Sequence, residues 1–94
     1  MGEDETSIAK AREIARAILR YLEIHPDAKD TLEGIAKWWL WLELNDQLRG
    51  EVEKAVSLLV SRGFILETRR EGVPTYYKLN PEKRKDLSIL LEGS

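Results

Sequence analysis

Apolar residues recur every three or four positions along most of the chain, which is the spacing of helices that bury one face. Three such stripes predict helices over residues 7–24, about 30–44 and about 46–62. The apolar positions expected in the shared core are Ile8, Ala11, Ile14, Ala15, Ile18, Leu19, Leu22, Leu32, Ile35, Ala36, Trp39, Leu40, Leu48, Val52, Ala55, Val56 and Leu59. The first two thirds of the chain therefore predict a helical core.

Polar residues, proline and glycine mark the expected helix ends. Pro26 ends the first helix, because the residue before a proline avoids helical backbone. Asp30 is the expected cap of the second helix, since a glutamate follows three positions later as in a capping box. Asn45 or Asp46 is expected to cap the third helix. Gly63 suits the left-handed residue that follows the end of that helix.

From residue 64 the apolar period changes to two, which is the period of a strand with one buried face. The change predicts strands over about 64–69 and 75–79, joined by turn residues at 71–74. In the second strand Tyr77 and Leu79 should face the core, with their neighbours along the strand facing outward. The pattern therefore predicts a β-hairpin.

A last helix is expected over about 81–92, with Asn80 as its cap and Pro81 as its first residue. Residues 1–6 read as a flexible acidic tail, and residues 7–94 as a single domain. Ninety-four residues are enough for one buried core. The predicted fold class is therefore α+β and mainly helical.

This order of helix, short helix, longer helix, hairpin and helix resembles the winged helix-turn-helix family of bacterial and archaeal transcriptional regulators. Segment 52–65, in which a helix ends at Arg62-Gly63 before an apolar strand, is similar to their junction between helix three and the wing. Segment 75–79 is similar to their final wing strand. The resemblance covers residues 7–80 and implies a three-helix core, a wing over 64–79 and a C-terminal helix. One departure is a longer interval between the second and third helices.

The resemblance implies a DNA-binding protein and a role in transcription regulation, with helix three toward the major groove and the wing toward the backbone. The residues that would contact double-stranded DNA are Gln47, Arg49, Lys54, Ser57, Arg69, Arg70 and Lys78. Arginine suits guanine and glutamine suits adenine, whereas basic side chains on a wing contact phosphate. The alternative for the wing is a solvated hairpin with cross-strand charge pairs.

The charge distribution supports DNA binding only weakly. The net charge is −2, with 6 basic and 10 acidic residues in 1–47 and 9 basic and 7 acidic residues in 48–94. The half that contains helix three and the wing is the basic half, but a surplus of this size is modest for a DNA-binding protein. Arg12, Arg16 and Arg20 repeat every four residues along helix one, either as a solvated face or as a contact to phosphate.

The tryptophans favour a second interpretation. Trp38, Trp39 and Trp41 cannot all face one side of a helix, so Trp39 is expected in the core and one of the others partly exposed. Exposed aromatic residues are favoured anchors of protein interfaces. The candidate interface residues are Trp38, Trp41, Leu58, Leu87, Leu90 and Leu91. A winged-helix protein-interaction module without DNA binding therefore stays open, and so does a homodimer through the terminal helices.

Enzymatic chemistry finds no support in the sequence. The chain has no cysteine, and its single histidine, His25, precedes Pro26, where a role at a helix end is expected. No nucleotide-binding or metalloprotease motif occurs, so we expect no catalytic residue, no metal ligand and no cofactor. The chain also lacks an apolar run of membrane-spanning length and a signal-peptide pattern. These features predict a cytoplasmic protein that does not bind membranes.

Overall fold

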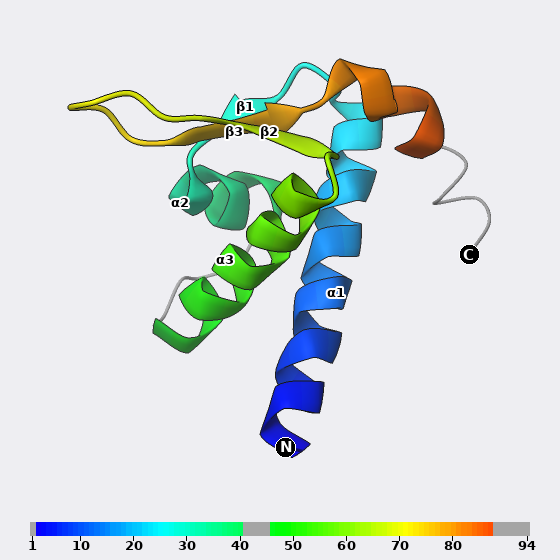
Figure 1. The fold of residues 1–94 in the computed structure, drawn as a ribbon, viewed down its shortest axis with the longest axis vertical. Helices are drawn as coiled ribbons and strands as arrows, with labels where there is room; N and C mark the ends of the chain where they lie inside the picture. The colour runs from blue at the N-terminus through cyan, green and yellow to red at the C-terminus, as the bar shows by residue number, and fades with distance from the viewer. Residues whose placement is uncertain (1, 41–45, 88–94) are drawn as a thin grey trace.

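The computed structural model describes residues 2–40 and 46–87. The long helix α1 (Gly2–Ile24) is followed by the short strand β1 (Lys29–Asp30) and the helical turn α2 (Leu32–Gly34), which continues as the π-helical turn η1 (Ile35–Trp39). The next elements are helix α3 (Asp46–Ser61), strands β2 (Ile65–Thr68) and β3 (Tyr76–Leu79), the 3-10 turn η2 (Pro81–Lys83), and a helical segment over residues 84–87. The mainly helical α+β class is confirmed (Figure 1).

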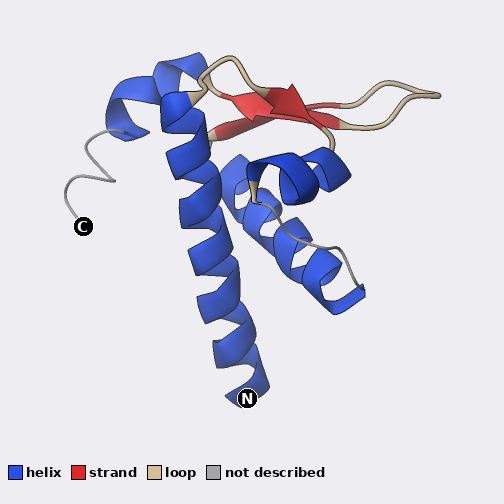
Figure 2. Ribbon diagram, turned by 180° about the vertical axis from the view of Figure 1, so that it is seen from behind, coloured by secondary structure: helices blue, strands red, loops and turns tan. Residues whose placement is uncertain are grey.

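The three strands form one antiparallel sheet in the order β1-β3-β2. One face of this sheet lies against α2 and the C-terminal end of α3, and the other face is turned away from these helices (Figures 1 and 2). Strand β1 was not expected, because two residues are too few to show a period in the sequence. Its residues pair with the central strand, Lys29 with Lys78 and Asp30 with Tyr77.

The core lies where α1, α3, η1 and the inner face of the sheet meet. Nearly all the predicted stripe positions whose side chains are described are buried there, and Leu32, Leu40 and Leu48 are half-buried. The fully buried side chains include Ile18, Leu22, Ile35, Val52 and Ile65. The inward positions of β3 are also confirmed, since Leu79 is buried and Tyr77 is half-buried against the core.

The start of the second helix corrects the sequence prediction. Asp30 belongs to β1, and the cap is Thr31, whose Oγ1 accepts a hydrogen bond from the Gly34 N–H (3.2 Å). The Asp30 carboxylate instead accepts a hydrogen bond from the Thr31 N–H (2.8 Å) and lies where a Cβ on Gly34 would be. The absence of a side chain at Gly34 therefore lets β1 and α2 approach closely. The predicted end near residue 44 lies outside the described residues.

The end of α3 confirms the prediction for Gly63. Its φ of +81° is the left-handed conformation that glycine adopts without steric cost. The Phe64 N–H donates to the Leu59 carbonyl (2.9 Å), and the Gly63 N–H donates to the Val60 carbonyl (3.0 Å). These two bonds form a Schellman motif, which satisfies carbonyl groups at the helix end and directs the chain into β2.

The two chain ends differ from the prediction. Helix α1 begins at Gly2, so residues 2–6 extend the helix where a flexible tail was expected. Near the other end, Asn80 caps the last helix by accepting from the Glu82 N–H (3.1 Å), as predicted.

Leu87 is fully buried in the core and so is not the interface residue that we expected, because its side chain completes the packing of its own chain. Leu90 and Leu91 lie outside the described residues.

Candidate nucleic-acid interface

The outward face of α3 is formed by polar and charged residues. Glu53, Lys54, Ser57 and Ser61 are exposed on it. The Ser61 hydroxyl donates a hydrogen bond to the Leu58 carbonyl (2.9 Å). Ser57 is exposed to solvent. The side chain of Gln47 lies outside the described part of the chain. This face therefore combines small polar side chains with one acidic and one basic residue.

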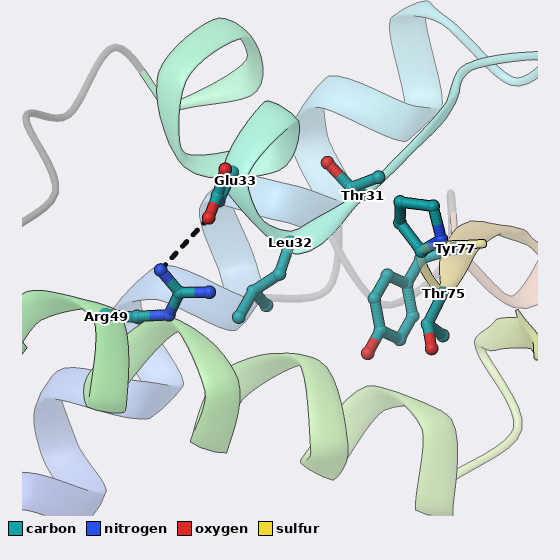
Figure 3. Close-up of a pocket in the computed structure, with 7 residues that line it drawn as sticks. Thr31, Leu32, Glu33, Arg49, Thr75 and Tyr77 are labelled. Carbon is teal, nitrogen blue, oxygen red and sulfur yellow. Dashed lines mark hydrogen bonds and ion pairs between the residues drawn. The ribbon is translucent and has the colours of Figure 1, made fainter. Parts of the chain in front are cut away.

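Arg49 is held by two carboxylates, of which Figure 3 shows that of Glu33. Its Nη1 donates to Glu33 Oε1 on α2 (3.1 Å), and its Nε lies 3.9 Å from Glu53 Oε1 one turn along α3. Exposed ion pairs of this kind contribute at most about 1 kcal/mol of stability each. Their effect on the surface is larger, because the positive charge of Arg49 is offset on both sides.

A pocket of about 270 Å³ lies between α2, α3 and the hairpin (Figure 3). Its lining residues are Thr31, Leu32, Glu33, Arg49, Pro74, Thr75 and Tyr77. Among the described residues of this lining, Glu33 and Arg49 alone are charged, and these two are paired with each other. The pocket therefore has no surplus charge with which to hold an anion.

The side of the hairpin that faces α3 is likewise close to neutral. The Arg69 guanidinium donates to both carboxylate oxygens of Glu67, at 2.9 and 3.4 Å. These hydrogen bonds and the charge of Glu67 raise the pKa of Arg69. Tyr77 lies opposite Glu67 on the neighbouring strand, on the same side of the sheet. Glu33, Glu53 and Glu67 thus offset Arg49 and Arg69 along the surface that joins α3 to the hairpin.

The raised pKa of Tyr77 leads to a prediction of how the free energy of unfolding depends on pH. Burial, followed by the charge of Glu67, raises the pKa of this phenol above its ordinary value of 10.0, although Arg69 acts in the opposite direction. The folded protein therefore holds this proton more tightly than the unfolded chain, so the stabilisation is complete below pH 10.0 and is lost as pH rises through the folded pKa. We expect Tyr77→Phe to remove this part of the alkaline loss of stability.

Urea unfolding followed by circular dichroism, between about pH 8 and pH 11, measures this effect. Tyr76→Phe is the matched control, because it removes the neighbouring hydroxyl from the opposite face of the same strand. The control is expected to lose as much stability at alkaline pH as the wild type. An equal loss of stability in the wild type and in Tyr77→Phe would contradict the prediction.

The outer face of the sheet is different in character. Residues directly opposite each other in antiparallel strands point to the same face, and so do alternate residues along a strand. The register therefore places Lys29, Lys78 and Tyr76 on one face, together with Leu66 and Thr68. Among the strand residues that the structure describes, none on this face is acidic. Lys29 and Lys78 are direct cross-strand partners.

The basic face continues toward the hairpin tip. A hollow of about 250 Å³ is lined by Lys29, Thr68, Arg70, Val73, Pro74 and Tyr76. Arg70 is exposed, and the Lys29 ammonium lies 5.3 Å from the centre of the Tyr76 ring. We call Lys29, Arg70, Tyr76 and Lys78 the outer basic face. It joins Arg70 and Lys78, which the sequence singled out, to Lys29, which it did not.

No signal in the sequence could have identified Lys29. The residue lies in the two-residue strand β1, which shows no period in the sequence, and only the pairing of β1 with β3 brings it beside Lys78. The structure also separates residues that the sequence grouped together. Arg69 lies on the side of the hairpin near Glu67, whereas Arg70 and Lys78 belong to the opposite face.

The candidate protein-interface residues are dispersed. Trp38 is 55% exposed, with the Lys37 ammonium 5.0 Å from its ring, and Trp39 is buried. The prediction that the tryptophans divide between core and surface is therefore confirmed for this pair. Leu58 is half-buried beside the core, on α3. Trp41 lies outside the described residues.

Comparisons with known proteins do not identify this chain, since no protein-family model, curated protein or solved structure matches it. Within the described residues, no helix has both the length and the apolar character needed to cross a membrane.

Proposed function

We propose that this protein is a winged helix-turn-helix protein that binds double-stranded DNA, with the outer basic face of the hairpin sheet as its main contact to the phosphate backbone. The order of elements and the pairing of the hairpin with a short strand before the second helix support this proposal. A role in transcription regulation is the part of the proposal that rests on the family resemblance alone.

The observation that carries the proposal is the cross-strand pair of Lys29 and Lys78. Like charges directly opposite each other in a sheet destabilise it, and here no acidic strand residue on the same face compensates them. An anion between the two ammonium groups would remove this repulsion. A phosphate is such an anion, and Arg70 adds a guanidinium that can hold the next phosphate along a backbone.

The outward face of α3 has a secondary part in this proposal. Arg49 is offset by Glu33 and Glu53, so it adds little attraction for phosphate unless DNA displaces one of these carboxylates. Lys54 and Ser57 are exposed and lie where a groove contact would need them. We therefore infer that the sheet provides the affinity for DNA and that α3 provides such sequence preference as exists.

Fluorescence anisotropy with a labelled random-sequence duplex tests the proposal. Three phosphate contacts predict a slope of log K against log salt of about −2.7, which is an affinity loss of roughly fortyfold between 50 and 200 mM salt. Lys29→Ala with Arg70→Ala and Lys78→Ala should bring the slope close to zero. The matched control replaces three exposed cations elsewhere, Lys10→Ala with Arg20→Ala and Arg84→Ala, and so has the same net charge.

The control is expected to keep most of the slope of the wild type, and both triple variants must show the thermal unfolding of a folded protein. If both variants lost the same part of the salt slope, DNA binding would depend only on net charge, and the proposed contact face would be wrong. Absence of binding at low salt, at concentrations up to about 0.1 mM, would reject DNA binding altogether.

A second candidate function is that of a winged-helix protein-interaction module, and one observation favours it. Trp38 exposes 55% of its surface, and an indole of this exposure is a typical anchor of a protein interface. This candidate predicts a partner that quenches or shifts the tryptophan fluorescence of the wild type but not of Trp38→Phe. It becomes the leading proposal if the duplex does not bind.

A further inference from the structure

A groove of about 520 Å³ runs between α1 and the C-terminal half of α3, on a different part of the surface from the outer basic face. Its apolar floor is formed by Ala15, Leu19, Leu58, Leu59 and Phe64. Leu58 and Phe64 are only half-buried, so this floor leaves apolar surface in contact with solvent. The well-packed core lies directly beneath it, since Ala15, Leu19 and Leu59 are buried.

The charged residues that line the groove, within the described part of the chain, are all basic. Arg12 and Arg16 come from successive turns of α1, and Arg62 directly follows the last residue of α3. The Lys83 ammonium lies 5.8 Å from the centre of the Phe64 ring, but it is paired with the Asp86 carboxylate (3.7 Å) and adds no unbalanced charge. None of the described residues that line the groove is acidic. An apolar floor with a cationic rim is complementary to an apolar surface bordered by carboxylates.

The dimensions of the groove suit a helix. Arg12 and Leu19 are separated by seven residues of α1, which correspond to about 10 Å of helix rise. The anchors of an amphipathic helix at positions i, i+4 and i+7 cover the same length, and such helices bind in apolar grooves between helices. Arginine side chains also hold carboxylates through paired hydrogen bonds, which gives the rim a way to select an acidic helix.

We propose that this groove docks an acidic amphipathic helix of a partner protein. Its apolar stripe covers Leu58 and Phe64, and its flanking carboxylates meet Arg12, Arg16 and Arg62. Phosphate contact alone explains the groove less well, because a nucleic-acid backbone would pair with the arginines and leave the apolar floor uncovered. The inference goes beyond the proposed function, since it concerns a separate surface and a different class of ligand.

A designed peptide tests the inference without a known partner. The probe is a fluorescein-labelled helical peptide of about 15 residues, with leucines at i, i+4 and i+7 flanked by glutamates. The control peptide has the same composition, with its leucines distributed around the helix. We expect saturable binding of the probe and markedly weaker binding of the control peptide.

The protein variants locate the binding. Arg12→Ala with Arg62→Ala should weaken the probe's affinity about five- to thirtyfold, because two charge-assisted contacts are lost. Arg20→Ala with Arg84→Ala removes two exposed arginines that do not line the groove, and it should leave the affinity unchanged. Lys29→Ala with Arg70→Ala and Lys78→Ala should also leave it unchanged, which separates this inference from the proposed function.

NMR amide shifts of the wild type provide an independent readout, with the largest changes expected at Leu19, Leu58 and Phe64. Three outcomes would overturn the inference. The first is equal binding of both peptides, and the second is no binding of the probe at concentrations up to about 1 mM. The third is a wild-type protein that sediments as a dimer while the Arg12→Ala with Arg62→Ala variant sediments as a monomer. A second copy of the chain would then be the occupant of the groove.

Discussion

Trp39→Ala is expected to lower the free energy of unfolding by about 3–5 kcal/mol, the usual cost of removing a large aromatic side chain from a core. Trp39 is 6% exposed and stacks on Tyr21 of α1, with ring centroids 5.0 Å apart and an angle of 10° between the ring planes. The indole therefore links the π-helical turn to α1. Its loss removes both apolar burial and an aromatic contact that contributes about 0.5–1.5 kcal/mol beyond burial.

The neighbouring residue provides the matched control for this measurement. Trp38→Ala removes an identical side chain that is 55% exposed, and we expect it to cost less than about 1 kcal/mol. Urea or guanidinium unfolding of the three proteins, analysed for midpoint and slope, gives the comparison. Similar costs for the two substitutions would show that the turn is packed differently from the structure described above.

The second prediction is that Lys78→Glu changes stability and DNA affinity in opposite directions. In the free protein the substitution converts a like-charge pair with Lys29 into an opposite-charge pair, which should raise the free energy of unfolding by roughly 0.5 kcal/mol. In the complex it replaces a phosphate contact with a repulsive carboxylate, so we expect the affinity for duplex DNA to fall about tenfold or more at low salt.

Thermal unfolding and anisotropy titration on the same preparations measure the two effects. Lys85→Glu is the control, because it makes the same change of net charge at an exposed position of the C-terminal helical segment, outside the strands of the sheet. It should change the affinity only slightly and should not raise the stability through a cross-strand pair. A Lys78→Glu protein that is less stable than the wild type, or that binds DNA as tightly, would contradict the proposed role of the outer basic face.

Lys29 and Lys78 carry like charges and are direct cross-strand partners where β1 pairs with β3. The side of the hairpin near α3 shows the opposite arrangement, with Arg69 bound to Glu67 and Arg49 bound to Glu33. The hairpin thus has one face with balanced charges and one face with a surplus.

Local patterns were sufficient to predict most of the fold. The stripe on α1 from Ala11 to Leu22 identified the core face, because burial of one face and the helical period leave little choice. Gly63 and Asn80 marked ends of elements through backbone chemistry that depends only on nearby residues. The alternation that placed Leu79 inward and Lys78 outward was equally local.

The remaining features depend on contacts between residues distant in the sequence, and local periods carry no information about these. Strand β1 forms because its residues pair with β3. Asp30 belongs to this strand, and so the cap of α2 is Thr31 and not Asp30. The same pairing brought Lys29 beside Lys78. Charge distribution along a chain is visible in its sequence, but which charges share a face is decided only when strands and helices are brought together.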